Sequence, residues 1–125
     1  MVWEYLYPEI RSDTVEKVWG FCLDRKNKLI LTEAVTSGTA NASLIHPREV
    51  FRPAIRYGAT AVILAHNHPS GDPSPSTADL KVTKKIFEAA KVVDLEIHDH
   101  VILGEPENCP NGFGYFSFSD NGLFN

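Results

Sequence analysis

Residues 65–79 read AHNHPSGDPSPSTAD, a stretch that combines two histidines two positions apart with a serine and an aspartate at the start of a predicted helix. The apolar residues 59–65 before the first histidine include β-branched side chains and predict a buried strand. Side chains alternate along a strand, so His66 and His68 are predicted on one face, where both rings can reach one metal ion. The Pro-, Ser- and Gly-rich residues that follow predict a loop.

The predicted helix begins with Ser76 and Asp79, which match the Ser-x-x-acid pattern of a capping box. The short loop can bring Asp79 beside the two histidines, and two neutral imidazoles with one carboxylate suit zinc and leave a fourth position for water. Taken separately, the histidine pair also fits polar residues at a strand end, and the Ser-Asp pair a simple helix cap. Capping and ligation are compatible, because a helix N-terminus keeps a carboxylate ionised.

The complete spacing resembles the JAMM motif of the JAB/MPN metalloprotease fold: His66, one residue, His68, seven residues, Ser76, two residues, Asp79. Three segments narrow the resemblance to the RadC family of bacterial proteins: AHNHPSGDP at 65–73, HPREVF at 46–51 and DHVI at 99–102. The similarity extends from about Glu16 to the residues near the end of the chain, 122–124.

This resemblance implies an MPN (JAB) fold of the α/β (α+β) class, cytidine-deaminase-like, with a mixed, mainly antiparallel curved sheet flanked by helices. It also implies one zinc ion (Zn2+) held by His66, His68 and Asp79. The implied activity is that of a metallopeptidase-type hydrolase, which cleaves a peptide or isopeptide bond with zinc-activated water. The implied partner is a peptide or protein substrate.

An enzyme of this type also needs a glutamate that takes a proton from the water and passes it to the leaving amine. The resemblance assigns this role to Glu16, just before the apolar residues 18–23. Two alternatives remain open. Glu33 interrupts an apolar strand and otherwise fits an outward-facing position, and Glu49 lies in the first turn of a predicted helix, where its charge suits the helix N-terminus.

Ser76 and a second histidine pair each have two interpretations. Ser76 can donate a hydrogen bond to the oxyanion of a tetrahedral intermediate, a contact often worth ~3 kcal/mol, or can act only as the helix cap. His98 and His100, in a predicted strand, can support a ligating imidazole through its other ring nitrogen, and Asp99 is adjacent. Such pairs more often lie on the strand surface, and that interpretation is favoured.

The 125 residues, 43% of them hydrophobic, predict a single MPN domain over 1–125, with 1–15 as an N-terminal helix or coil lead-in. Strands interleaved with two helices predict an α/β or α+β domain, and a hairpin turn at 25–28 makes the sheet mixed. The expected elements, in order, are strand 18–23, strand 29–36, helix 47–57, strand 60–66, helix 77–93, strand 95–103 and a final strand near Tyr115.

Composition and charge limit the cellular context. The sequence shows neither a transmembrane run nor a secretory signal pattern, so no membrane partner is expected. Its two cysteines, Cys22 and Cys109, offer no disulfide framework. These observations together favour a cytoplasmic location. A net charge of -4 does not support nucleic-acid binding by this domain. The oligomeric state is not predicted.

The expected function is therefore a zinc-dependent hydrolase of the JAMM metallopeptidase type. The alternative is a weakly active or inactive MPN binding module in a DNA-repair or mobile-element context, which holds a partner in the groove near the zinc. A metal-dependent nuclease is less favoured, because two metals and more carboxylates would be usual. Complete RadC-like proteins resemble this chain plus an N-terminal helix-hairpin-helix region, where a nucleic-acid role could reside.

Overall fold

The computed structural model describes residues 17–36, 45–68, 72–104 and 114–122, and the predicted lead-in 1–15 lies outside them. All the other predicted elements are present, with ends that differ from the prediction by at most one residue. Neither helix in the described ranges is long and apolar enough to span a membrane. The elements are β1 (Val18–Leu23), β2 (Leu29–Thr36), α2 (Pro47–Arg56), β3 (Ala61–Asn67), α3 (Thr77–Val92), β4 (Glu96–Leu103) and β5 (Tyr115–Ser117).

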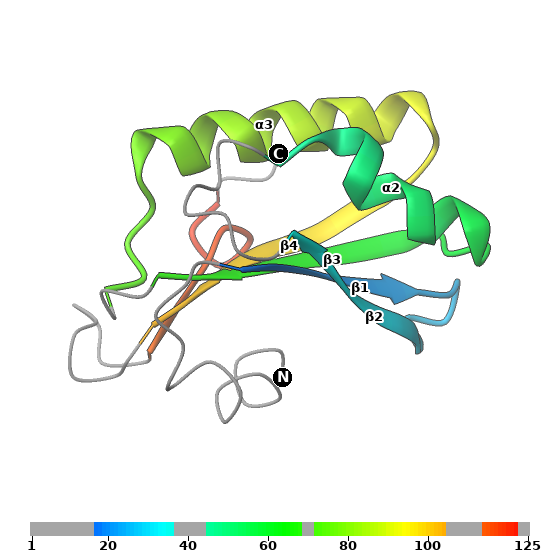
Figure 1. The fold of residues 1–125 in the computed structure, drawn as a ribbon, viewed down its shortest axis with the longest axis horizontal. Helices are drawn as coiled ribbons and strands as arrows, with labels where there is room; N and C mark the ends of the chain where they lie inside the picture. The colour runs from blue at the N-terminus through cyan, green and yellow to red at the C-terminus, as the bar shows by residue number, and fades with distance from the viewer. Residues whose placement is uncertain (1–16, 37–44, 69–71, 105–113, 123–125) are drawn as a thin grey trace.

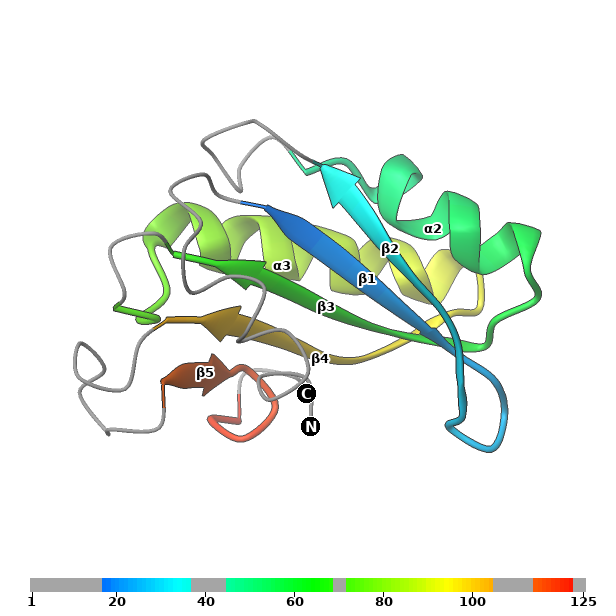
Figure 2. The same cartoon turned by 60° about the horizontal axis from the view of Figure 1, so that its bottom comes forward.

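The strands form one sheet in the order β2-β1-β3-β4-β5, seen in Figure 2. β1 pairs antiparallel with β2 and β3, β3 pairs parallel with β4, and β4 pairs antiparallel with β5. The sheet is therefore mixed and mainly antiparallel, as predicted. The parallel pair is connected through α3, which carries the chain from the end of β3 back to the start of β4.

The β1–β2 hairpin is closed by one aspartate. The Asp24 carboxylate accepts hydrogen bonds from the backbone N–H groups of Lys26 and Lys28, at 2.8 and 2.9 Å. Asn27 takes the left-handed conformation, with φ of 61°, which asparagine adopts more readily than most residues. The predicted turn at 25–28 is confirmed by these contacts.

Both helices cover the same face of the sheet (Figure 1). Along β1, Val18 and Cys22 belong to the core beneath the helices, whereas Trp19 and Phe21 belong to a buried cluster on the other face. In β3 the same alternation sends Val62, Leu64 and then His66 toward the helices. Further buried members of the core under the helices are Val50, Phe51, Ala54, Val82, Ile86, Ala90 and Ile97.

The β3–β4 pairing contains a register shift that affects the second histidine pair. Val62 pairs with Ile97, but its neighbour Ile63 pairs with Asp99, so His98 is an extra residue in β4. An extra residue interrupts the regular alternation of faces. As a result, Ile97 before the shift belongs to the core beneath the helices, and His100 after the shift contacts Thr83 of α3 on the same side of the sheet.

Candidate metal centre

The end of β3 positions the two histidines of the first pair. His66 is the penultimate residue of the strand and is completely buried, whereas His68 follows the strand and is partly exposed. The backbone N–H of His68 donates to the Leu103 carbonyl at 2.9 Å, which extends the pairing with β4 by one residue. Asn67, between the two histidines, accepts a hydrogen bond from the backbone N–H of Lys17 through its side-chain oxygen, at 2.6 Å.

The first turn of α3 positions the aspartate. Ser76 is the N-cap, and its hydroxyl oxygen accepts a hydrogen bond from the Asp79 N–H at 3.0 Å. The Ser76 N–H donates in return to Asp79 Oδ2 at 2.8 Å, which completes the capping box. The predicted helix cap is present, and it fixes the Asp79 carboxylate in a buried position, 1% exposed.

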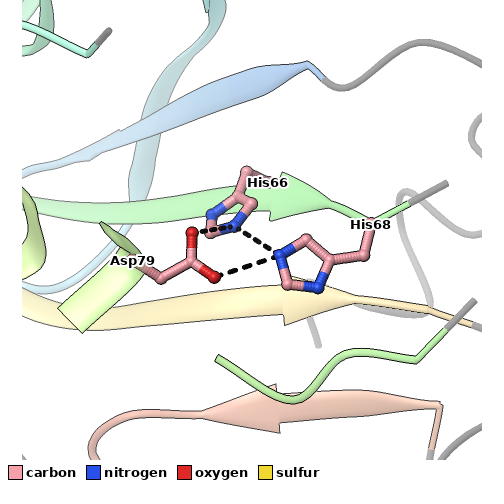
Figure 3. Close-up of side chains that lie close together, drawn as sticks. All are labelled: His66, His68 and Asp79. Carbon is pink, nitrogen blue, oxygen red and sulfur yellow. Dashed lines mark hydrogen bonds and ion pairs between the residues drawn. The ribbon is translucent and has the colours of Figure 1, made fainter. Parts of the chain in front are cut away.

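Figure 3 shows the three side chains pointing toward one another. His66 Nε2 lies 3.2 Å from Asp79 Oδ1, and His68 Nε2 lies 3.1 Å from Asp79 Oδ2. The two Nε2 atoms are 3.2 Å apart. The structure thus brings together the three residues that the sequence spacing singled out, each with one candidate ligand atom within 4.8 Å of the others.

The Asp79 carboxyl carries a strongly perturbed pKa. Burial would raise this pKa, but the close contacts with the His66 and His68 rings and the hydrogen bond from the Ser76 backbone N–H outweigh burial. Together they hold the pKa of Asp79 far below its ordinary value. The carboxylate is therefore ionised through the neutral and mildly acidic range, which is the form that binds a metal ion.

The other ring nitrogen of His68 has a partner that settles the position of its proton. His68 Nδ1 lies 2.9 Å from the Asp72 carbonyl oxygen. A carbonyl oxygen can only accept, so Nδ1–H donates to Asp72 and the neutral ring keeps its lone pair on Nε2. Metal-ligating histidines are commonly oriented in this way. The loop between β3 and α3 therefore orients His68 as well as bringing in Asp79.

The second histidine pair divides between the two predicted roles. His98 is half-buried, and its Nε2 lies 2.9 Å from the Asn27 side-chain oxygen, far along the strand from the metal centre. His100 is completely buried, and its Nε2 lies 2.7 Å from His66 Nδ1. The prediction that this histidine pair lies on the strand surface was therefore wrong for His100. Its ring contacts Nδ1 of His66, the nitrogen that does not face Asp79 and His68.

His100 is itself held on two further sides. Its Nδ1 is hydrogen-bonded to the Thr83 hydroxyl, and its ring stacks on Phe118 with centroids 4.9 Å apart and planes at 10°. Burial, and then the neighbouring His66, lower the pKa of His100 well below its ordinary value, so the ring is neutral near pH 7. Sequence reasoning missed Thr83. The available signal was its place one helical turn after Asp79, which puts both residues on one face of α3.

Asp99 does not support an imidazole side chain, although it is adjacent to both histidines in sequence. Its carboxylate accepts from the backbone N–H groups of His100, at 2.8 Å, and Ser119, at 2.9 Å. It also accepts from the Ser117 hydroxyl. Asp99 therefore ties β4 to β5 and to the turn that follows it.

The three candidate glutamates are distributed as follows. Glu16 lies outside the described residues. Glu33 is exposed on β2, and Glu49 lies in the first turn of α2, where its carboxylate is 3.3 Å from Arg52 and 3.5 Å from Arg48. Within the described ranges, neither Glu33 nor Glu49 belongs to the cluster formed by the two histidines and Asp79.

The fold and this cluster define a mixed α+β domain with a candidate metal centre at the end of a central strand. The family model described as "RadC-like JAB domain" matches residues 1–123. The chain belongs to this family.

Curated relatives agree with that assignment. The chain is 45% identical over 122 residues to a UPF0758 protein of Symbiobacterium thermophilum, a match that covers 98% of this chain and 49% of the relative. It is 43% identical over 122 residues to a UPF0758 protein of Methanosarcina barkeri, covering 98% and 50%. It is 46% identical over 120 residues to one of Chlorobium phaeovibrioides, covering 96% and 51%. The chain thus spans about half the length of these relatives.

Proposed function

We propose that this domain is a zinc-dependent hydrolase of the JAMM metallopeptidase type, which cleaves a peptide or isopeptide bond in a peptide or protein substrate. The observation that carries the proposal is the spacing of the three candidate ligands. His66 Nε2 lies 3.2 Å from His68 Nε2 and 3.2 Å from Asp79 Oδ1, and His68 Nε2 lies 3.1 Å from the other carboxylate oxygen, Asp79 Oδ2. Tetrahedral zinc with bonds of ~2.0–2.1 Å requires donor atoms ~3.3 Å apart. The two imidazole nitrogens are therefore close to this separation, and one ligand atom from each of the three residues lies within 4.8 Å of the others, which supports a site for a single zinc ion.

The chemistry of the donor set also suits a catalytic rather than a structural zinc. Two imidazole nitrogens and one carboxylate oxygen are ligands that zinc accepts, and three protein ligands leave a fourth position for water or substrate. When bound, zinc would supply Lewis acidity, which polarises a carbonyl group and lowers the pKa of water toward ~7. His66, His68 and Asp79 would hold it.

Glu16 is proposed as the general base, which takes a proton from the attacking water and delivers it to the leaving amine. The structural support comes from its neighbour in sequence. Lys17 is joined to Asn67 by two hydrogen bonds, one to the Asn67 side chain at 2.6 Å and one from the Asn67 backbone N–H at 3.3 Å. The residue after Glu16 is therefore held beside the residue that separates the two histidines.

Ser76 is proposed as the donor to the oxyanion of the tetrahedral intermediate. Its hydroxyl oxygen accepts from the Asp79 N–H, and this contact leaves the hydroxyl proton available for donation. Ser76 is exposed and lies in the same helical turn as Asp79, so a substrate carbonyl near the metal would be close to it. Such a donor typically contributes ~3 kcal/mol to transition-state stabilisation.

The proposal is tested in two stages. Metal analysis of protein purified without chelators or added zinc should show about one zinc per chain, and the Asp79→Asn variant should show none. A peptide-library assay should then show cleavage by the unaltered protein and none by Glu16→Gln with its zinc retained. Stoichiometric zinc without cleavage of any library member would overturn the peptidase assignment and favour a binding module. Failure to bind added zinc would overturn the metal centre itself.

A further inference from the structure

The ring of His66 presents two nitrogens to two different environments. Its Nε2 faces Asp79 and His68, and its Nδ1 faces His100 at 2.7 Å. A neutral imidazole carries one proton, so Nε2 can bind a metal only if the proton is on Nδ1. For His68 a carbonyl fixes this arrangement, but a histidine partner can either donate or accept. The tautomer of His66 therefore depends on that of His100.

His100 is placed in turn by a third residue. Its Nε2 faces His66, and its Nδ1 faces the Thr83 hydroxyl. If Nε2 accepts from His66, the single proton of the neutral ring is on Nδ1 and donates to the Thr83 oxygen. If these two hydrogen bonds ran in the opposite direction, the single proton of His66 would be on Nε2 and directed at Asp79. Nε2 could then not bind a metal ion.

We propose that His100 and Thr83 are positioning residues of the metal centre, which hold His66 as the tautomer with Nδ1 protonated and Nε2 directed at the ion. In this hydrogen-bond chain His66 Nδ1–H donates to His100 Nε2, and His100 Nδ1–H donates to Thr83 Oγ1. This inference rests on the metal centre of the proposed function and adds two residues to it.

Burial makes the support specific. His100 is completely buried and stacks on Phe118 with a centroid distance of 4.9 Å, so the ring cannot swing aside and be replaced by bulk water. Thr83 is also buried, at 4% exposure. An apolar residue at position 100 would leave the His66 Nδ1–H without its acceptor inside the protein. Loss of such a partner typically weakens metal binding by about 10- to 100-fold.

The hydrogen-bond chain also connects the three elements that form the site. His66 comes from β3, His100 from β4 and Thr83 from α3, and Thr83 follows Asp79 by one helical turn. The same face of α3 therefore supplies a candidate ligand and the end of the hydrogen-bond chain. A shift of α3 that moved Asp79 would also disturb the support of His66.

The test measures zinc dissociation constants by competition with a chromophoric chelator, using matched variants. His100→Phe, which keeps a flat ring without nitrogens, should weaken zinc binding about 10- to 100-fold. His100→Gln, whose amide oxygen can accept near the position of Nε2, should restore most of the affinity. Thr83→Val should weaken binding and Thr83→Ser should not. His98→Phe, in the same strand but bonded to Asn27, is the control and should bind normally.

A spectroscopic measurement on the unaltered protein keeps the inference testable if His100→Phe does not fold. Two-bond proton–nitrogen NMR spectra of the zinc-loaded protein should show His66 protonated at Nδ1, and His100 protonated at Nδ1 as well. A His100 protonated at Nε2, or normal zinc affinity in a folded His100→Phe, would overturn the inference while leaving the metal centre intact. Absence of zinc binding by the unaltered protein would instead overturn the proposed function.

Discussion

Ser76 and Asp79 hold each other by two reciprocal hydrogen bonds, at 3.0 and 2.8 Å, and the oxygen of Asp79 that Ser76 binds is the one that faces His68 at 3.1 Å. The cap that starts α3 and the geometry of the candidate metal centre are therefore the same structural feature. A carboxylate that would otherwise rotate is fixed at the helix N-terminus, where the helix dipole favours its negative charge. Helix formation and the arrangement of the ligands are coupled through this pair.

Substitutions of Ser76 separate the capping role from the proposed oxyanion role. Ser76→Ala should lower the free energy of unfolding by about 1 kcal/mol, and Ser76→Gly by only a few tenths, because glycine is tolerated at the N-cap and alanine is not. Chemical denaturation of the metal-free protein measures this difference. Both variants lack the hydroxyl, so both should lose turnover about 100-fold if Ser76 also stabilises the oxyanion. Normal turnover by Ser76→Gly would reduce Ser76 to a helix cap.

Asp79→Asn should abolish zinc binding with little change in the shape of the site. The amide oxygen of asparagine can still accept from the Ser76 N–H, so the helix cap is largely kept, but the negative charge is lost. Zinc content after dialysis against a metal-buffered solution is the measurement. Asp72→Asn is the matched control, because the Asp72 carboxylate accepts from the Ser74 N–H in the same loop and is outside the ligand cluster. Equal loss in both variants would contradict a specific role of Asp79.

Zinc binding at pH 5 should displace no proton from Asp79, because that carboxyl is already ionised. A metal ion takes only neutral imidazoles, so it competes with protons for His66 and His68. The depressed pKa of Asp79 means that its carboxylate is already ionised, and its stabilising contacts are lost only below the ordinary carboxyl pKa of ~3.9. Calorimetric titration in buffers of different ionisation enthalpy measures the protons released. A third proton released at pH 5 would contradict the ionised state of Asp79.

The sequence predicted the elements of this fold well, because its local signals agree with the tertiary structure. Apolar β-branched residues before His66, a turn at Asp24 and a capping box at Ser76 each specify one element boundary through short-range chemistry. The convergence of His66, His68 and Asp79 was also accessible, because a strand, a short loop and a helix start place all three within fifteen consecutive positions. Local contacts of this kind can be predicted from spacing.

The contact between His66 and His100 could not be predicted in the same way. His98 and His100 look equivalent in a regular strand, because residues two positions apart lie on the same face of the sheet. The register shift opposite Val62 and Ile63 changes the faces, and the β3–β4 pairing decides which histidine meets His66. Neither the shift nor the pairing has a signal in the residues of β4 alone. Contacts that depend on long-range register are therefore where a single sequence stops being informative.

Glu16→Gln should abolish turnover and leave the zinc in place. The substitution is close to isosteric and removes only the basic carboxylate, so the loss should fall in the range of about 100- to 10,000-fold that proton transfer by a positioned group contributes. Rates on a substrate found in the peptide library, together with zinc content, form the measurement.

Glu33→Gln and Glu49→Gln are the controls, and both should keep full activity. Glu33 is exposed on β2, and Glu49 is paired with Arg52. If Glu33→Gln or Glu49→Gln loses turnover while Glu16→Gln retains it, the general base is on β2 or α2. The contact between Lys17 and Asn67 would then have only a structural role.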